Sequence, residues 1–244
     1  IQYKPNNLTY EVKSSKGGVI VFSEIQYLQH RLLKWFDENQ RIFPWREDRA
    51  TKYQQIVSEI LLQRTKAETV AKYYDTFFSK FPDWNTLANA SLEELEEIMK
   101  PLGLYRHRAR RLYKLGEDIR RRGGRIPGNE NALRDSGFIG LYVTNAFELF
   151  ILRNRKPLLD VNMSRLLKRY FKPGDFIDVR HDKEIQELAN DIIEVRRCKE
   201  LNWAILDYAA LVCKTRNPLC GECVLNKHCK YYELSQGDVT EESE

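Results

Sequence analysis

Apolar residues recur every three or four positions along most of the chain, which is the period of a helix with one buried face. The pattern is clear from Ile25 to Phe36 and again from Ile56 to Leu61. It predicts helices over residues 25–39, 52–66, 67–80, 106–122, 142–153, 161–171, 183–195 and 201–213. Residues 1–22 lack this period, and we interpret them as an N-terminal arm. The sequence therefore predicts an all-α fold.

Turn-forming residues separate the predicted helices. Pro44 ends any helix that enters residues 41–46, because proline lacks the backbone N–H that a helix interior needs. Ser91 and Glu94 form a capping box, which predicts a short helix that begins there and ends near Met99. These signals divide the helical part of the chain into many short rods.

A glycine-bearing turn, residues 136–141, joins a short predicted helix at 131–135 to the helix that starts at Tyr142. Glycines at a helix start let backbone N–H groups approach a phosphate, which the helix dipole also attracts. Gly137, Ile139 and Gly140 are therefore candidates for holding a DNA strand without reading its sequence. A plain connection between two helices is the alternative interpretation.

The spacing after this turn brings two polar residues to one end of a helix pair. The helix from Tyr142 is about 18 Å long, and residues 154–160 reach a little over about 20 Å if extended. Asp160, at the start of the next helix, is therefore expected beside Tyr142. Two helix N-termini would meet there, and their positive field is expected to keep Asp160 ionised. An ordinary helix N-cap is the alternative role for Asp160.

Composition and charge narrow the class of protein. The 244 residues are 42% hydrophobic and 31% charged, which indicates a globular protein with a substantial core. No stretch approaches the roughly 20 apolar residues of a membrane span, and no signal peptide is expected. The net charge is +5, and ten basic or titratable residues fall within positions 106–125. This cluster, with Arg106 and Arg108 at its start, indicates a polyanionic partner or else a solvated helix face.

Four cysteines, Cys213, Cys220, Cys223 and Cys229, are spaced by six, two and five intervening positions. Their thiolates can surround one metal centre. Zinc usually takes two separated C-x-x-C pairs, whereas the single C-x-x-C here has unequal flanks, which favours a [4Fe-4S] cluster over zinc. Disulfides are disfavoured because the cysteines crowd one end of the chain. Cys198 is left over as a predicted buried thiol.

Several of these stretches together resemble one family, the helix-hairpin-helix DNA glycosylases with a C-terminal iron-sulfur cluster. The family includes endonuclease III, the adenine DNA glycosylases and the thymine/uracil mismatch glycosylases. The resemblance is carried by Phe43-Pro-Trp-Arg46, Ser58 to Thr65, the turn at 137–140, Leu159 to Asn162 with Arg165, and the cysteine pattern. It implies two helical lobes with a helix-hairpin-helix motif and a cluster loop. We place the borders as an arm at 1–22, a cluster-bearing lobe of 23–50 with 154–232, a hairpin lobe of 51–153 and a disordered acidic tail at 233–244.

The resemblance also assigns roles to single residues. It implies that Asp160 is the catalytic aspartate, which stabilises an oxocarbenium-like sugar and positions or deprotonates water. Family members with lyase activity carry a lysine where this chain has Tyr142, and that lysine forms a Schiff base. Tyrosine with Glu59 retained looks most like the thymine-DNA mismatch glycosylases. In such an enzyme Tyr142 and Glu59 contact the flipped nucleotide, while Gln63 fills the vacated space beside Arg64.

The sequence thus predicts a monofunctional glycosylase that releases thymine or uracil opposite guanine, with double-stranded DNA as partner and a [4Fe-4S] cluster as cofactor. Removal of mispaired adenine is one alternative, against which Tyr142 and the lack of a proofreading domain count. A non-catalytic DNA-binding module is another, which Phe138 in place of the usual first hairpin glycine permits but the intact Glu59, Tyr142 and Asp160 disfavour. We expect a monomer away from membranes, in a reducing intracellular compartment, which is the cytoplasm and nucleoid if the source is a prokaryote.

Overall fold

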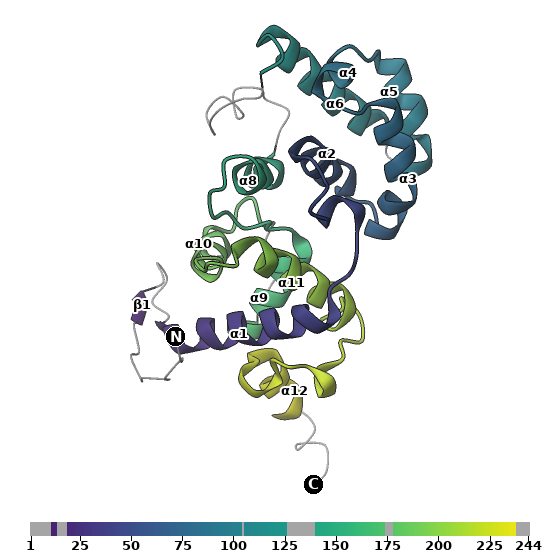
Figure 1. Cartoon of the computed structure of the whole chain (residues 1–244). Coiled ribbons are helices and arrows are strands. Elements are labelled where there is room, and N and C mark those ends of the chain that lie inside the picture. Colours follow the sequence, from purple (N-terminus) through teal and green to yellow (C-terminus); the bar gives the residue numbers. More distant parts are fainter. Residues whose placement is uncertain (1–10, 14–18, 104, 126–139, 174–177, 238–244) are drawn as a thin grey trace. The chain divides into compact units, whose positions relative to one another are not determined.

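The computed structural model describes residues 11–13, 19–103, 105–125, 140–173 and 178–237. These residues are mainly helical, which confirms the predicted all-α class (Figure 1). Contacts divide the chain into two compact units, one of residues 1–41 with 157–244 and one of residues 42–156. The unit borders therefore follow residues 41 and 156, where the sequence analysis places lobe borders after residues 50 and 153.

The unit of residues 42–156 is built from short helices joined by capped turns. Its elements are η1 (Pro44–Arg46), α2 (Lys52–Leu62), α3 (Ala67–Lys80), α4 (Trp84–Ala88), α5 (Leu92–Met99), η2 (Lys100–Leu102), α6 (Tyr105–Arg121) and α8 (Leu141–Phe150). The predicted capping box of Ser91 and Glu94 is present at the start of α5. In this unit α6 packs against α4 and α5, while α2 packs against α3 and α8. Gly116 permits a close approach of α6 to α4, since a Cβ there would lie 3.0 Å from Ala88 Cα.

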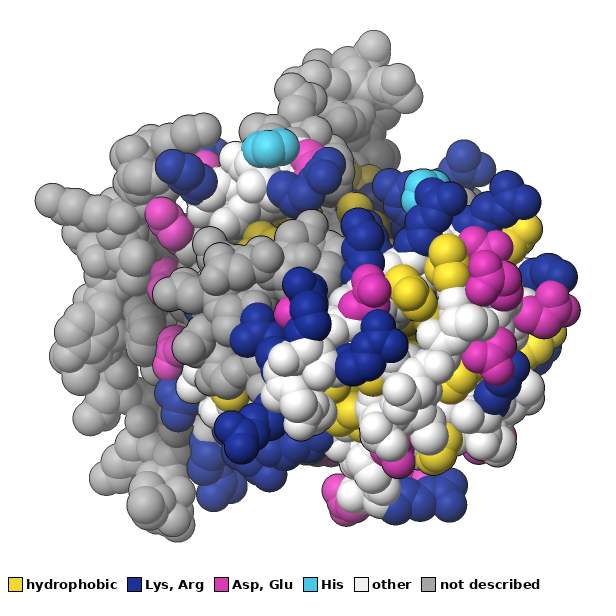
Figure 2. Space-filling model, turned by 90° about the horizontal axis from the view of Figure 1, so that it is seen from above, with side chains coloured by type: hydrophobic (Ala, Val, Ile, Leu, Met, Phe, Trp, Pro, Cys, Tyr) yellow, Lys and Arg dark blue, Asp and Glu magenta, His cyan; other side chains and the backbone are white. Residues whose placement is uncertain are grey.

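The basic helix α6 has a sharply divided surface. Leu112, Leu115 and Ile119 are buried on one side, while the opposite side carries the exposed basic residues Arg106, His107, Arg110, Arg111, Lys114, Arg120 and Arg121. Lysine and arginine side chains are numerous on the face shown in Figure 2, with acidic side chains among them. The amphipathic period of α6 thus turns one face to the core and leaves most of its charge in solvent.

Helix α2 is shorter than its predicted range of 52–66. It ends at Leu62, and Gln63 is its C-cap. Arg64 then adopts the left-handed conformation with a φ of 58°, which is uncommon for a residue other than glycine. A sharp turn therefore separates α2 from α3, and no glycine or proline in the sequence marks it.

The unit of residues 1–41 and 157–244 is assembled around α9. Its helices are α1 (Phe22–Asn39), α9 (Val161–Phe171), α10 (Lys183–Ile192), α11 (Cys198–Leu211), η3 (Cys220–Glu222), η4 (Asn226–His228) and α12 (Lys230–Gly237). Helix α9 contacts α10, α11 and α12, and α1 packs against α11. Leu28 and Leu32 on α1 and Leu167 on α9 are fully buried. Arg41, the last residue of the segment 1–41, makes an ion pair of 2.7 Å with the buried Asp207.

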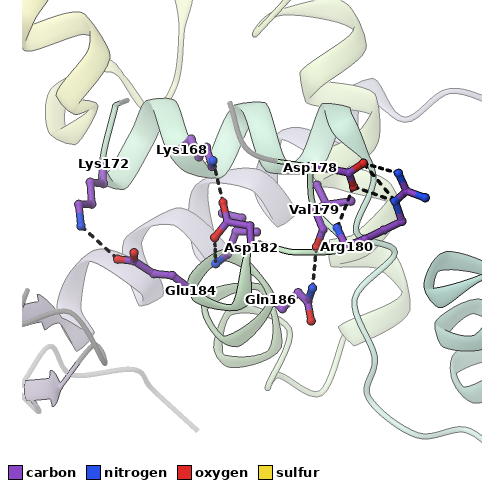
Figure 3. Close-up of polar contacts among 9 residues, drawn as sticks. Lys168, Lys172, Asp178, Val179, Arg180, Asp182, Glu184 and Gln186 are labelled. Carbon is purple, nitrogen blue, oxygen red and sulfur yellow. Dashed lines mark hydrogen bonds and ion pairs between the residues drawn. The ribbon is translucent and has the colours of Figure 1, made fainter. Parts of the chain in front are cut away.

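Ion pairs fasten α10 to α9 at its N-terminal end (Figure 3). Lys168 Nζ lies 2.7 Å from Asp182 Oδ2, and Asp182 Oδ1 accepts a hydrogen bond from the backbone N–H of Ile185. Lys172 makes a second pair with Glu184 at 3.3 Å. Asp182 is therefore both the N-cap of α10 and the acceptor that binds it to α9, which fixes the helix that carries Asp160.

Three elements differ from the sequence analysis. Within the predicted arm, β1 (Glu11–Lys13) pairs antiparallel with β2 (Val19–Val21), so the fold contains one small two-stranded sheet. Helix α11 ends at Leu211, which leaves Cys213 just beyond the helix rather than inside it. Helix α12 extends to Gly237, so the first five residues of the predicted tail at 233–244 are helical. Across the part of the chain that the structure describes, no helix has the length and apolar character needed to cross a bilayer.

Candidate functional site

Glu59 and Tyr142 meet in the unit of residues 42–156. Glu59 lies in the buried middle of α2 and is only 3% exposed. Tyr142 is half-buried in the first turn of α8. Its phenolic hydroxyl donates a hydrogen bond of 2.7 Å to Glu59 Oε2. A carboxylate so far from solvent needs such a donor, and the bond in turn fixes the direction of the tyrosine ring.

Gly140 precedes this turn as the N-cap of α8 and is exposed. Apart from Gly140 and its chain neighbours, no atom of the residues that the structure describes lies within 4 Å of the position that a Cβ would take on it. A glycine at this position lets a phosphate approach the backbone N–H groups at the start of the helix closely. Gly137, Ile139 and Phe138 lie outside the residues that the structure describes, and the predicted roles of Gly137 and Ile139 stay predictions.

Asp160 lies in the other unit and caps α9. Its Oδ1 accepts hydrogen bonds of 2.8 Å from the backbone N–H groups of Asn162 and Met163, and its Oδ2 accepts one of 2.7 Å from the Asn162 side chain. Burial raises the pKa of Asp160 above its ordinary value, although these bonds and nearby Arg165 act in the opposite direction. We expected the helix field to hold the group ionised. Burial has the larger effect, because it removes water from the charged form.

A chain of hydrogen bonds leads from Asp160 towards the cysteine loop. Asn162 donates to Asp160 through its amide nitrogen, while its Oδ1 accepts 3.0 Å from Arg165 Nη1. Arg165 Nε donates to the carbonyl oxygen of Cys213 at 3.1 Å, and its Nη2 donates to that of Ala209 at 2.8 Å. The orientation of the Asn162 amide is therefore fixed from both sides. From the sequence, Asn162 and Arg165 are positions that match the family, with no function predicted for either.

The four cysteines of the loop have free thiols. Burial is the main cause that raises the pKa of Cys220, Cys223 and Cys229, and in each the charge of Cys213 acts in the same direction. Cys213 therefore acts electrostatically on each of the other three thiols. Among the residues that the structure describes, no three Cys, His, Asp or Glu side chains group closely enough to hold one metal ion.

Two side chains donate hydrogen bonds to these sulfur atoms. The hydroxyl of Tyr208 lies 3.2 Å from Cys223 Sγ, and it also accepts 2.7 Å from the backbone N–H of Val224. Arg169 Nη1 lies 3.6 Å from Cys213 Sγ and 2.6 Å from the carbonyl oxygen of Lys214. Such donors stabilise thiolates, which are the form that binds metal. Cys198 is buried at the start of α11, away from this group in sequence, as predicted.

The side chains predicted to contact DNA lie in different environments. Arg106 and Arg64 are exposed, and Gln63 is half-buried. Arg108 is only 3% exposed, and its guanidinium faces internal acceptors, among them the carbonyl oxygen of Leu102 at 2.9 Å. The structure thus places Arg108 inside the unit rather than on the basic face of α6. Helical spacing gives the reason, because Arg108 is one turn before the buried Leu112.

Comparisons with known proteins point to one kind of chemistry. A family model described as "HhH-GPD superfamily base excision DNA repair protein" matches residues 57–195. The thymine/uracil-DNA glycosylase of Methanothermobacter thermautotrophicus is 32% identical over 204 residues, which is 83% of this chain and 91% of that protein. The thymine-DNA glycosylase of Aeropyrum pernix is 34% identical over 213 residues, covering 85% of this chain and 95% of the relative. The solved structure of a thermostable thymine-DNA glycosylase superimposes with a TM-score of 0.79 at 31% identity, covering 87% and 98% of the two chains.

Proposed function

The chain belongs to the HhH-GPD superfamily of base excision DNA repair proteins, and from this premise we propose that it excises thymine or uracil mispaired with guanine. As a DNA glycosylase it is a hydrolase of N-glycosyl bonds. The relatives named thymine or thymine/uracil-DNA glycosylase support a pyrimidine as the released base. The proposal is carried by one observation, the hydrogen bond of Tyr142 to the buried Glu59.

Tyr142 decides the type of reaction in this proposal. A lysine in this position has an amine that attacks the sugar and forms a Schiff base, whereas a phenol hydrogen-bonded to a carboxylate is not such a nucleophile. The bond holds the Tyr142 ring in one orientation, in which it packs against or hydrogen-bonds the extruded nucleotide. The attacking group is therefore water, and the product is an intact strand with an abasic site.

In the proposed reaction Asp160 acts on the sugar as the base departs. Loss of the base leaves positive charge on the sugar, and a nearby carboxylate stabilises that charge. The raised pKa also suits a group that accepts a proton from water, because a general base works best when its pKa approaches the working pH. The proposal requires Asp160 and Tyr142 to serve the same nucleotide. They belong to different units of the chain, and their meeting stays a prediction.

Extrusion of the base precedes this chemistry. A glycosylase reaches its bond only after the nucleotide has left the stack, and a wobble G:T pair lowers the cost of that step. Gln63 and Arg64 lie at the end of α2, the helix that carries Glu59. We assign Gln63 to the space that the base leaves, with Arg64 and Arg106 beside the DNA backbone.

The cysteine loop suits a [4Fe-4S] cluster, which we propose as the cofactor. The four cysteine thiols are free, and those of Cys223 and Cys213 accept hydrogen bonds from Tyr208 and Arg169; cysteine thiolates are the ligands that such a cluster uses. Cys213, Cys220, Cys223 and Cys229 would hold the cluster, which would brace the loop that Arg165 connects to Asn162 and Asp160. The proposed reaction passes through no step at the cluster.

A panel of duplexes tests the proposal. The purified protein is incubated with DNA that contains G:T, G:U, A opposite G, or A opposite oxidised guanine, and the released bases are identified. We expect thymine and uracil from the first two and little adenine. Release of adenine alone would indicate the purine-specific alternative, and binding without release of any base would indicate a non-catalytic module. Either result contradicts the proposal.

A further inference from the structure

Arg108 is a buried cation that donates four hydrogen bonds. All four acceptors lie in two turns of the unit of residues 42–156, the turn at 63–65 and the turn at 102–103. Its Nη1 donates to the carbonyl oxygens of Leu102 and Gly103 at 2.9 and 2.5 Å. Its Nη2 donates to the carbonyl oxygen of Gln63 and to Thr65 Oγ1. The planar fork of arginine reaches all four acceptors at once, which a lysine ammonium does not do.

Two further contacts hold the same turn. The Thr65 hydroxyl, which accepts from Arg108, donates 3.3 Å to the carbonyl oxygen of Leu102. Arg111, one turn further along α6, donates to the side-chain oxygen of Gln63. The backbone and the side chain of Gln63 are thus held by two different arginines of one helix.

The turn itself has a conformation that needs such support. Arg64 has a φ of 58°, in the left-handed region that side chains other than glycine rarely adopt. Gln63 and Thr65 flank it, and both accept hydrogen bonds from Arg108. Arg64 is exposed at the tip. Without Arg108, the residues on both sides of Arg64 would each lose a hydrogen bond.

We propose that Arg108 is a positioning residue for base extrusion, which fixes the turn of residues 63–65 so that Gln63 and Arg64 meet the DNA in one preformed conformation. This inference rests on the proposed function. Its physical basis is preorganisation, since a turn already in its working conformation loses no conformational entropy when it enters the duplex. Burial also distinguishes Arg108 from the exposed arginines of α6. In this proposal the exposed arginines act on DNA through solvent, whereas Arg108 acts through the turn.

The first test measures the turn in the free protein. Hydrogen exchange of the Thr65 amide, which donates to the carbonyl oxygen of Leu62 at 3.0 Å, reports whether the turn opens. Arg108→Met and Arg108→Lys are expected to speed this exchange by about tenfold or more. Arg120→Met is the matched control, because Arg120 is an exposed arginine of the same helix and its change should leave the exchange unaltered. Unchanged exchange in both Arg108 variants overturns the inference, whatever the enzyme releases.

The second test separates extrusion from general damage. Single-turnover thymine release is compared for a G:T pair in a regular duplex and for the same pair within a short bubble, where unstacking costs little. Arg108→Lys should slow release from the duplex by roughly tenfold or more and from the bubble far less. Equal slowing of both overturns the positioning role. If wild type releases no pyrimidine from either DNA, the proposed function fails instead, and the exchange measurement still decides the part about the turn.

Thr65→Val gives an independent variant if the arginine substitutions impair folding. It removes one acceptor of Arg108 and the bond to Leu102, while Arg108 itself stays in place. The expected result is faster Thr65 amide exchange and a duplex-specific loss of rate, both smaller than in Arg108→Lys. A Thr65→Val protein with wild-type exchange and a wild-type duplex rate contradicts the inference.

Discussion

The hydroxyl of Tyr142 donates a hydrogen bond of 2.7 Å to Glu59 Oε2, which joins the first turn of α8 to the buried middle of α2. The two residues are 83 positions apart in sequence. Because the carboxylate is almost fully buried, the bond contributes both to the stability of the unit and to the orientation of the tyrosine.

Replacing Tyr142 by phenylalanine keeps the ring and removes the donor. We expect the free energy of unfolding to fall by about 1–3 kcal/mol, since a buried carboxylate loses a hydrogen bond, and thymine release to slow. Urea denaturation and single-turnover release measure the two effects. Glu59→Gln is the matched variant, because its amide oxygen can still accept from Tyr142 and its stability should stay nearer to that of wild type. A Tyr142→Phe protein as stable and as active as wild type would contradict the role of the bond.

Asp160→Asn separates capping from catalysis. The asparagine oxygen can still accept from the backbone N–H groups of Asn162 and Met163, so α9 and the affinity for DNA should be largely retained. Release of thymine should fall by about 10² to 10⁴-fold, the usual contribution of a general base. Binding by fluorescence anisotropy and base release by chromatography give the two readouts. Unchanged release would refute the assigned role.

The direction of the Asp160 pKa shift predicts the pH dependence as well. Release needs the carboxylate, so its rate should rise with pH through the raised pKa and level off above it. A raised pKa stabilises the folded state fully below the ordinary aspartate pKa, and this contribution is lost as pH rises through the folded value. Wild type should therefore lose stability relative to Asp160→Asn over that window. Parallel stability curves for the two proteins would show that Asp160 does not titrate as proposed.

Asn162 should tune this titration. Its side chain donates to Asp160 Oδ2 and lowers the pKa of Asp160 against the effect of burial. Asn162→Leu removes that donor while the residue's backbone N–H bond to Oδ1 remains. We expect the midpoint of the pH–rate profile to move to higher pH, with little change in the rate at the alkaline plateau. A profile with an unmoved midpoint would exclude Asn162 as a determinant of the Asp160 pKa.

Tyr142→Lys tests the placement of this residue at the sugar. An amine in the first turn of α8 is expected to attack the sugar and form a Schiff base that borohydride traps. The neighbouring Glu59 should favour the protonated amine, so trapping should increase with pH. Gel electrophoresis of the reduced complex detects the covalent species. Absence of trapping at every pH would count against the location of Tyr142 in the nucleotide pocket.

The helices were predictable where the apolar period is unbroken. Helix α9 has the predicted bounds, Val161 to Phe171, because its buried residues recur at regular spacing. The turn at Arg64 was not predictable, since an arginine in the left-handed conformation carries no local signal, and its neighbours Gln63 and Thr65 accept hydrogen bonds from Arg108, which lies far along the chain. The small sheet of β1 and β2 was missed for a related reason, because three-residue strands are too short to show alternation.

Within the candidate site, the sequence predicted individual residues but not their surroundings. It selected Glu59, Tyr142 and Asp160, yet the bond between the first two depends on packing of α2 against α8. The raised pKa of Asp160 follows from burial, which the helix-field argument did not weigh. Arg108 was interpreted from its charged neighbours, although its spacing from Leu112 already placed it on the apolar face of α6. The helical period therefore predicts whether a single charged residue is buried better than the charge of its sequence neighbours does.

Tyr208 should tune the proposed cluster without a role in base release. Its hydroxyl donates to Cys223 Sγ at 3.2 Å from a fully buried position in α11. Hydrogen bonds to cluster sulfurs favour the reduced, more negative state, so Tyr208→Phe should lower the reduction potential, on the order of tens of millivolts. Iron content, the absorption spectrum and a redox titration followed by electron paramagnetic resonance provide the measurement. Cys223→Ser is the comparison, because it alters a proposed ligand and should reduce the iron content itself. A Tyr208→Phe protein with full iron and an unchanged potential would contradict the role of the hydroxyl, whereas failure of wild type to bind iron would contradict the cluster.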